Sequence, residues 1–172
     1  MPDNRTFLKT IIQSATVELF QAYRVAAAPV VTGSQLAENL DNYVGGYGNF
    51  YGPGLNGTLA MLVPRDVFSL VKVEGLRVFN VLDWTRELTN QLLGRIKNRL
   101  VQYQMALRTD TPSAIEGKSL ELRRAGATPF VSIVFRTIRG DILVTLTGTI
   151  DYSKFSYSGA VVTANEGDVI LF

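Results

Sequence analysis

Residues 83–112 read DWTRELTNQLLGRIKNRLVQYQMALRTDTP and contain no proline before Pro112. Asp83 is a good N-cap residue and basic residues follow further along, so the stretch predicts a helix of about five or six turns beginning at Asp83. At about 100° per residue, one side of this helix is apolar and would face a core. That side comprises Leu88, Leu92, Leu93, Ile96 and Leu100. We expect the rest of the chain to be built around this helix.

The opposite side of the helix carries an unusual stripe of residues. Asp83, Glu87, Asn90 and Gly94 follow at i, i+4, i+7 and i+11, which aligns them on the side turned away from the apolar arc. Glycine inside a helix costs roughly 1 kcal/mol relative to alanine. Something is therefore expected to come close at Gly94, although helical geometry alone leaves a plain solvated face as the alternative.

The composition indicates one domain with a substantial core. The chain has 172 residues, of which 47% are hydrophobic. We place the domain at residues 1–151 and treat residues 152–172 as a tail that forms either an extra hairpin or an assembly segment. The apolar runs are too short to cross a bilayer, and the first residues lack the layout of a secretory signal. The expected location is the cytoplasm, with no membrane partner.

The missing residue types exclude several kinds of chemistry. The chain has no cysteine and no histidine, which excludes thiol nucleophiles, Ser-His-Asp catalysis and the usual zinc sites. Asp83 and Glu87 are only two carboxylates on one helix, which is a poor metal site, so no metal of its own is expected. With 17 basic and 15 acidic residues, the charge is close to balanced and indicates no nucleic acid partner.

The remaining elements predict an α+β domain. Residues 5–23 have the pattern of an amphipathic helix, residues 24–32 of an edge or bent strand, and residues 34–40 of a short helix. A buried strand is predicted at residues 58–63, and a helix with Pro64 in its first turn at residues 65–72. Strands follow at residues 113–123, 129–137 and 141–150, with Gly140 in a hairpin turn. The expected architecture is a mostly antiparallel sheet packed against two long helices plus shorter helices.

The glycine-rich segment at residues 45–57 lacks the ending of a P-loop and the spacing of a dinucleotide fingerprint. We interpret it as a flexible surface loop whose aromatic residues cover the core or meet a partner. A small-molecule cavity lined by Tyr43, Tyr47 or Tyr51 is an alternative function. The basic residues of the long helix, Arg86 among them, have two interpretations: a solvated face, or electrostatic steering of an acidic partner.

The order Asp83, Glu87, Asn90 and the distant Pro112 resembles the signature of the CheC/CheX/FliY phosphatases of bacterial chemotaxis. In that family an Asp or Ser, a Glu, an Asn and a distant Pro recur in this order. The resemblance covers residues 6–150, including the strand before Pro64. A second site would place another Glu and Asn before Pro29 at the same spacings, and the sequence has neither residue there. This favours the CheX type, which has one site per chain.

The resemblance implies a substrate, the aspartyl phosphate of a CheY-like response regulator. It implies that Asn90 holds the attacking water, that Glu87 pairs with the receiver's active-site lysine, and that Gly94 leaves room for the receiver's backbone. Asp83, Arg86 and Pro112 would be supporting residues, and the receiver would bring its own Mg²⁺. The resemblance also implies a possible homodimer. A non-catalytic adaptor on the same fold, as in the FliM middle domain, is the alternative function.

Overall fold

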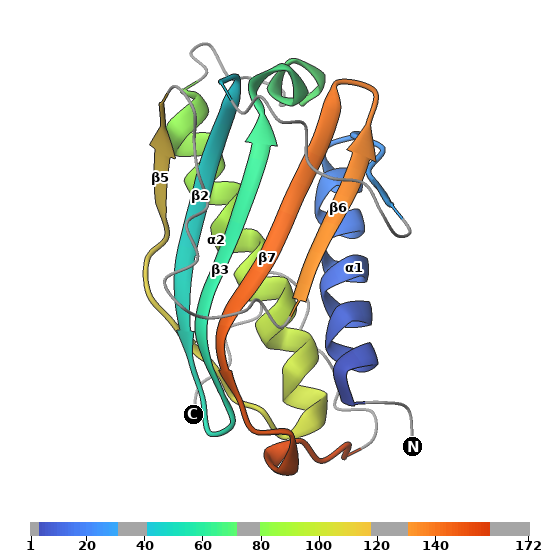
Figure 1. The fold of residues 1–172 in the computed structure, drawn as a ribbon, viewed down its shortest axis with the longest axis vertical. Helices are drawn as coiled ribbons and strands as arrows, with labels where there is room; N and C mark the ends of the chain where they lie inside the picture. The colour runs from blue at the N-terminus through green and yellow to red at the C-terminus, as the bar shows by residue number, and fades with distance from the viewer. Residues whose placement is uncertain (1–3, 31–40, 72–79, 118–130, 159–172) are drawn as a thin grey trace.

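The computed structural model describes residues 4–30, 41–71, 80–117 and 131–158 (Figure 1). The short helix predicted at residues 34–40 and the later part of the strand predicted at residues 113–123 lie outside them. The described residues form two layers, an antiparallel sheet and two long helices on one of its faces. The predicted α+β class is therefore confirmed.

In the described part of the chain, seven strands form one antiparallel sheet in the order β1-β6-β7-β3-β2-β4, with β5 also paired to β2. Gly140, the first residue of β7, directly follows the turn after β6 and has a φ of 121°, so the predicted hairpin is confirmed. β1 is an edge strand, as its proline predicts. The strands are β1 (Ala28–Pro29), β2 (Tyr43–Tyr51), β3 (Leu55–Pro64), β4 (Arg108–Thr109), β5 (Ser113–Glu116), β6 (Val131–Thr137) and β7 (Gly140–Ile150).

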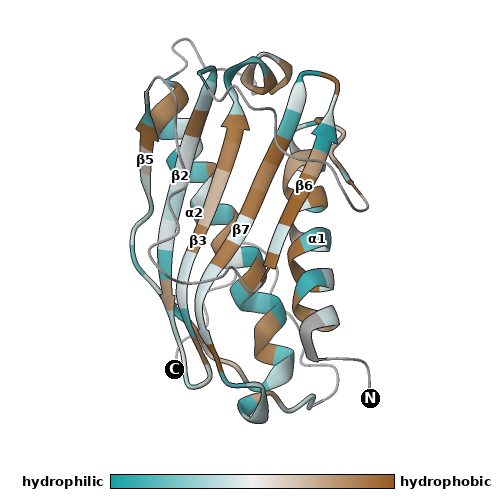
Figure 2. Ribbon diagram, viewed as in Figure 1, coloured by the Kyte–Doolittle hydropathy of each residue, from teal (hydrophilic) through white to brown (hydrophobic). Residues whose placement is uncertain are grey.

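Two long antiparallel helices, α1 (Asn4–Ala22) and α2 (Val81–Leu100), cover one face of the sheet (Figure 1). Side chains at alternate strand positions point into this interface; those of β6 are Val131, Ile133 and Phe135, and all three are buried. Hydrophobic and hydrophilic residues alternate around both helices in Figure 2, as expected for helices with one buried side. The core therefore lies between the helical layer and the sheet.

Three short 3₁₀ helices complete the described structure: η1 (Arg65–Leu70), η2 (Val101–Tyr103) and η3 (Tyr152–Lys154). The helix predicted after Pro64 is present as η1, and Val67 and Phe68 are buried in it. Pro64 is the last residue of β3 and precedes η1, so its predicted place inside the first helical turn is wrong.

The predicted surface loop at residues 45–57 is wrong, because these residues form the β2–β3 hairpin. Gly46 and Gly48 lie where α2 crosses β2 closely. A Cβ atom on Gly46 would stand 2.0 Å from Thr89 Oγ1, and one on Gly48 would stand 2.6 Å from Leu93 Cδ1. These glycines therefore serve a close helix–strand contact.

Candidate functional site

α2 begins at Val81 and is capped by Asn80. The Asn80 Oδ1 atom accepts hydrogen bonds from the backbone N–H groups of Leu82 at 3.0 Å and Asp83 at 3.2 Å. The predicted cap at Asp83 is wrong because Val81 and Leu82 pack against the core, which starts the helix two residues earlier. Asp83 lies exposed in the first turn, where a negative charge suits the helix dipole, and it forms an ion pair with Arg86.

The polar stripe predicted on α2 is present on its outer face. Asp83, Glu87 and Asn90 are exposed, whereas the apolar arc on the opposite side is buried. Within the described residues, a Cβ atom added to Gly94 would meet nothing within 4 Å. The Asn90 side chain makes no hydrogen bond with any residue in that same part of the chain. Along the stripe, the Glu87 carboxylate is therefore followed by the Asn90 amide, which has no partner among the described residues, and then by the space beside Gly94.

Glu87 has a hydrogen-bond partner that sequence reasoning missed. Its Oε1 atom accepts a bond of 2.7 Å from Gln91 Nε2, and the Gln91 amide also contacts the hydroxyl of Tyr23. The pair Glu87–Gln91 has the i, i+4 spacing that could have been noticed in the sequence. Tyr23 lies 68 residues earlier, so only the packing of α1 beside α2 brings it there.

Pro112 lies beside Gly48 of β2, at the place where α2 crosses that strand. Its side chain is buried, and a Cβ atom on Gly48 would meet both Pro112 Cγ at 3.4 Å and Leu93 Cδ1 at 2.6 Å. Leu93 lies three residues after Asn90, within the same turn of α2. The structure therefore brings the distant proline close to Gly48 and Leu93, on the buried side of α2 and not on the exposed stripe.

The basic residues further along α2 pair with α1. Arg99 forms an ion pair with Glu18, and Arg95 Nη1 lies 4.0 Å from the same carboxylate. Both arginine side chains are mostly covered, with exposed fractions of 24% and 20%. These two residues tie α2 to α1.

A family model described as chemotaxis phosphatase CheX matches residues 44–136, which is more than half of the chain. The chain belongs to the CheX family. The match covers all of α2 and all of β2 except Tyr43, so the CheX-family segment contains the stripe and nearly all of the strand that supports it.

Solved structures with the same fold include CheX proteins. The chain is similar to CheX from Desulfovibrio desulfuricans, with a TM-score of 0.68, 17% identity, and coverage of 82% of this chain and 99% of that one. For CheX from Vibrio vulnificus the TM-score is 0.67 and the identity 15%, and the similarity covers 83% of this chain and 97% of that one. For a chain of the CheX–CheY–BeF₃–Mg²⁺ complex from Borrelia burgdorferi the TM-score is 0.58 and the identity 13%, and the similarity covers 83% of this chain and 97% of that one. No curated protein matches the sequence. At these identities, the structures show a shared fold.

The described residues of this CheX-family chain contain no group of three acidic side chains that could hold a metal ion. None of the helices in these residues has the length and apolar character needed to span a membrane. Of the three tyrosines proposed to line a cavity, Tyr43 is buried and donates to the Asp141 carbonyl, whereas Tyr47 and Tyr51 are exposed.

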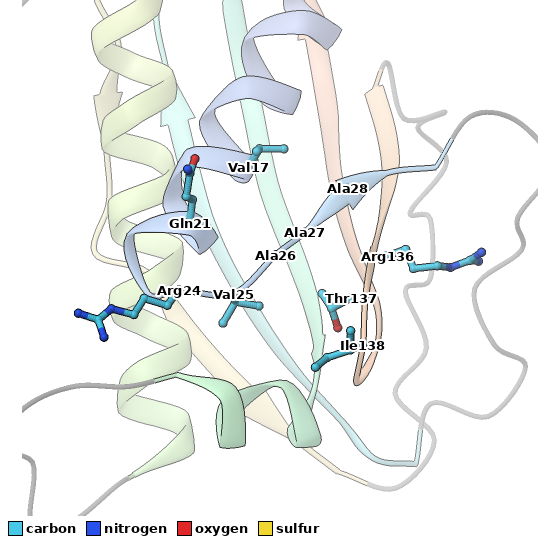
Figure 3. Close-up of a pocket in the computed structure, with 10 residues that line it drawn as sticks. All are labelled: Val17, Gln21, Arg24, Val25, Ala26, Ala27, Ala28, Arg136, Thr137 and Ile138. Carbon is cyan, nitrogen blue, oxygen red and sulfur yellow. The ribbon is translucent and has the colours of Figure 1, made fainter.

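A pocket lies away from the stripe, between the end of α1, β1 and the β6–β7 turn (Figure 3). Small apolar residues line much of it, including Val25 and the three alanines that follow. The side chains of Arg24 and Arg136 point in opposite directions in Figure 3, and Arg136 forms an ion pair with Asp141. The charged groups therefore do not converge on a ligand position, and α2 remains the candidate site.

Proposed function

We propose that this CheX-family chain hydrolyses the aspartyl phosphate of a CheY-like receiver domain. The observation that carries the proposal is the exposed pair Glu87 and Asn90 on the outer face of α2, followed by the open space at Gly94. The family description and the complex of CheX with CheY, BeF₃ and Mg²⁺ support this choice of reaction and partner.

Asn90 is the residue proposed to act on the reacting atoms. Hydrolysis of an acyl phosphate needs a water placed in line with the breaking bond and groups that neutralise charge. An amide can donate and accept hydrogen bonds at once, so the Asn90 side chain could hold that water beside the phosphoryl group. Its lack of a partner among the described residues leaves the amide available for this contact.

Glu87 is proposed to dock the receiver by an ion pair with the receiver's active-site lysine. The carboxylate is exposed one turn before Asn90, so one approaching surface could meet both residues. The receiver would supply Mg²⁺. Asp83 and Arg86 would flank the docking surface as a neutral pair, and Pro112 would support the helix from the side.

The test is the decay of a phosphorylated CheY-like receiver with and without this protein. We predict that Asn90→Ala lowers the acceleration by at least about 100-fold, because a misplaced water loses the orientation effect. Phosphate release is the measurement, and circular dichroism checks that the fold is intact. An Asn90→Ala variant with wild-type acceleration would exclude the proposed role of Asn90. A wild-type protein that binds the receiver without accelerating decay would instead be a non-catalytic adaptor.

A further inference from the structure

A chain of hydrogen bonds connects the Glu87 carboxylate to Tyr23, the residue that follows α1. Gln91 Nε2 donates to Glu87 Oε1 at 2.7 Å and to the Tyr23 hydroxyl oxygen at 2.8 Å. The Tyr23 hydroxyl in turn donates to Gln91 Oε1 at 3.0 Å. Gln91 and Tyr23 are both half-buried, whereas Glu87 is exposed. The network thus starts at the packed junction of the helices and ends at the surface.

Tyr23 is itself held from two sides. Its ring contacts Trp84 edge to face, with centroids 5.2 Å apart and planes at 86°. Its backbone N–H donates to the Phe20 carbonyl at 3.0 Å, and Arg24 follows with a φ of 60°, which turns the chain out of α1. The hydroxyl position is therefore fixed by packing and by the backbone, and it fixes the Gln91 amide in turn.

The partners of Glu87 in this network are electrically neutral. An exposed glutamate with no fixed partner exchanges among several rotamers, and ordering it on binding weakens the complex. A neutral amide can hold one rotamer while leaving the negative charge available to a cation. The nearby guanidinium of Arg86 is bound to Asp83 instead. The arrangement therefore orients the carboxylate without neutralising it.

We propose that Gln91 and Tyr23 are positioning residues that hold the Glu87 carboxylate in the orientation that receives the receiver's lysine. This inference rests on the proposed function of the chain, and neither residue is proposed to touch the reacting atoms. If Gln91 and Tyr23 served only to hold the two helices together, the network would not need to include Glu87. The ion pair between Glu18 and Arg99 already joins α1 and α2.

The central test is a double-mutant cycle with Gln91→Met and Glu87→Ala, measured on CheY-type receivers of the same organism phosphorylated with acetyl phosphate. Methionine keeps the length and helix preference of Gln91 but cannot donate to the carboxylate. We expect Gln91→Met to raise KM about fivefold to tenfold with kcat nearly unchanged, since docking is weakened and the chemistry is not. In the Glu87→Ala background the same change should have no further effect.

Two further variants separate positioning from folding. Tyr23→Phe removes only the hydroxyl and keeps the ring on Trp84, so it should raise KM by a smaller factor, about twofold to threefold. Gln21→Met changes an exposed glutamine of α1 and should leave KM unchanged. Should Gln91→Met fail to fold, Tyr23→Phe in the two Glu87 backgrounds gives the same cycle.

The outcomes distinguish the two levels of the proposal. An active wild-type protein in which Gln91→Met raises KM only when Glu87 is present supports the positioning role. An active wild-type protein in which Gln91→Met has no effect, or has equal effects in both backgrounds, overturns the positioning role and leaves the phosphatase function standing. A wild-type protein that neither binds nor dephosphorylates any of the receivers overturns both.

Discussion

Gly94 is a residue whose presence is not explained by packing among the described residues. Glycine in a helix interior costs about 1 kcal/mol relative to alanine because it loses more backbone freedom on folding. A Cβ atom at this position would meet nothing within 4 Å among the described residues, so those residues do not require glycine there. A partner that approaches α2 closely would require it, as we propose for the receiver.

Two substitutions at Gly94 should therefore affect stability and binding in opposite ways. Gly94→Ala is expected to raise the free energy of unfolding by about 0.5–1 kcal/mol, measured by urea denaturation. Gly94→Leu should also favour the helix, yet it should block binding of the receiver because its side chain fills the space beside Asn90. Binding of the Gly94→Leu variant at wild-type affinity would show that the partner does not use this space.

At the scale of elements, the contact between α2 and β2 positions the stripe. Thr85 and Thr89 are buried on the side of α2 that faces Gly46. Their hydroxyl groups donate at 2.7 Å to the carbonyls of Val81 and Thr85 within the helix, so no bond to the strand is needed. The strand has glycines at this contact, and the threonine hydroxyls of the helix are hydrogen-bonded within the helix. The two backbones can therefore lie close together.

Gly46→Ala tests this contact. The new Cβ atom would stand 2.0 Å from Thr89 Oγ1 and 3.1 Å from the Thr85 carbonyl oxygen, so the helix must shift. We expect a loss of at least about 2 kcal/mol in the free energy of unfolding, measured by urea denaturation. The matched control is Gly45→Ala on the opposite face of β2, where the nearest atoms belong to the side chains of Ile115 and Leu62. Equal losses in the two variants would contradict a special contact at Gly46.

The elements that the sequence predicts well are those whose pattern has one explanation. The 3.6-residue periodicity of α2 predicts both its buried arc and its exposed stripe, and alternation predicts the buried face of β6. The wrong predictions concern residue types that fit more than one structural role. Asn80 and Asp83 are both good caps, and only the packing of the residues between them decides which one acts.

β2 and the Gln91 network show a different limit of sequence reasoning. The glycines of β2 are typical of loops, and their use in a strand depends on a helix that begins about 30 residues later in the chain. The bond between Tyr23 and Gln91 likewise depends on how α1 lies beside α2. Neither relation has a local signature, because both arise from tertiary contact.

At the scale of the whole molecule, α2 is fixed to α1 at both ends. Tyr23 and Trp84 join the helices near the start of α2. Beyond the end of α2, Phe7 of α1 stacks on Tyr103 of η2 with ring centroids 4.7 Å apart. The segment after β7 closes this end, since the Phe155 ring contacts Phe7 at 5.1 Å. Residues 152–158 therefore pack on the end of the domain that lies furthest from the β6–β7 turn (Figure 1).

Phe155→Ala tests whether this closing segment stabilises the domain. The ring is half-buried, so we expect a loss of about 2 kcal/mol in the free energy of unfolding, roughly half the cost of deleting a fully buried phenylalanine. Urea denaturation measures the change. Ile138→Ala is the matched control, because Ile138 is 84% exposed in the turn at the opposite end and should change stability little. A Phe155→Ala variant as stable as this control would mean that residues 152–158 contact the domain without contributing to its stability.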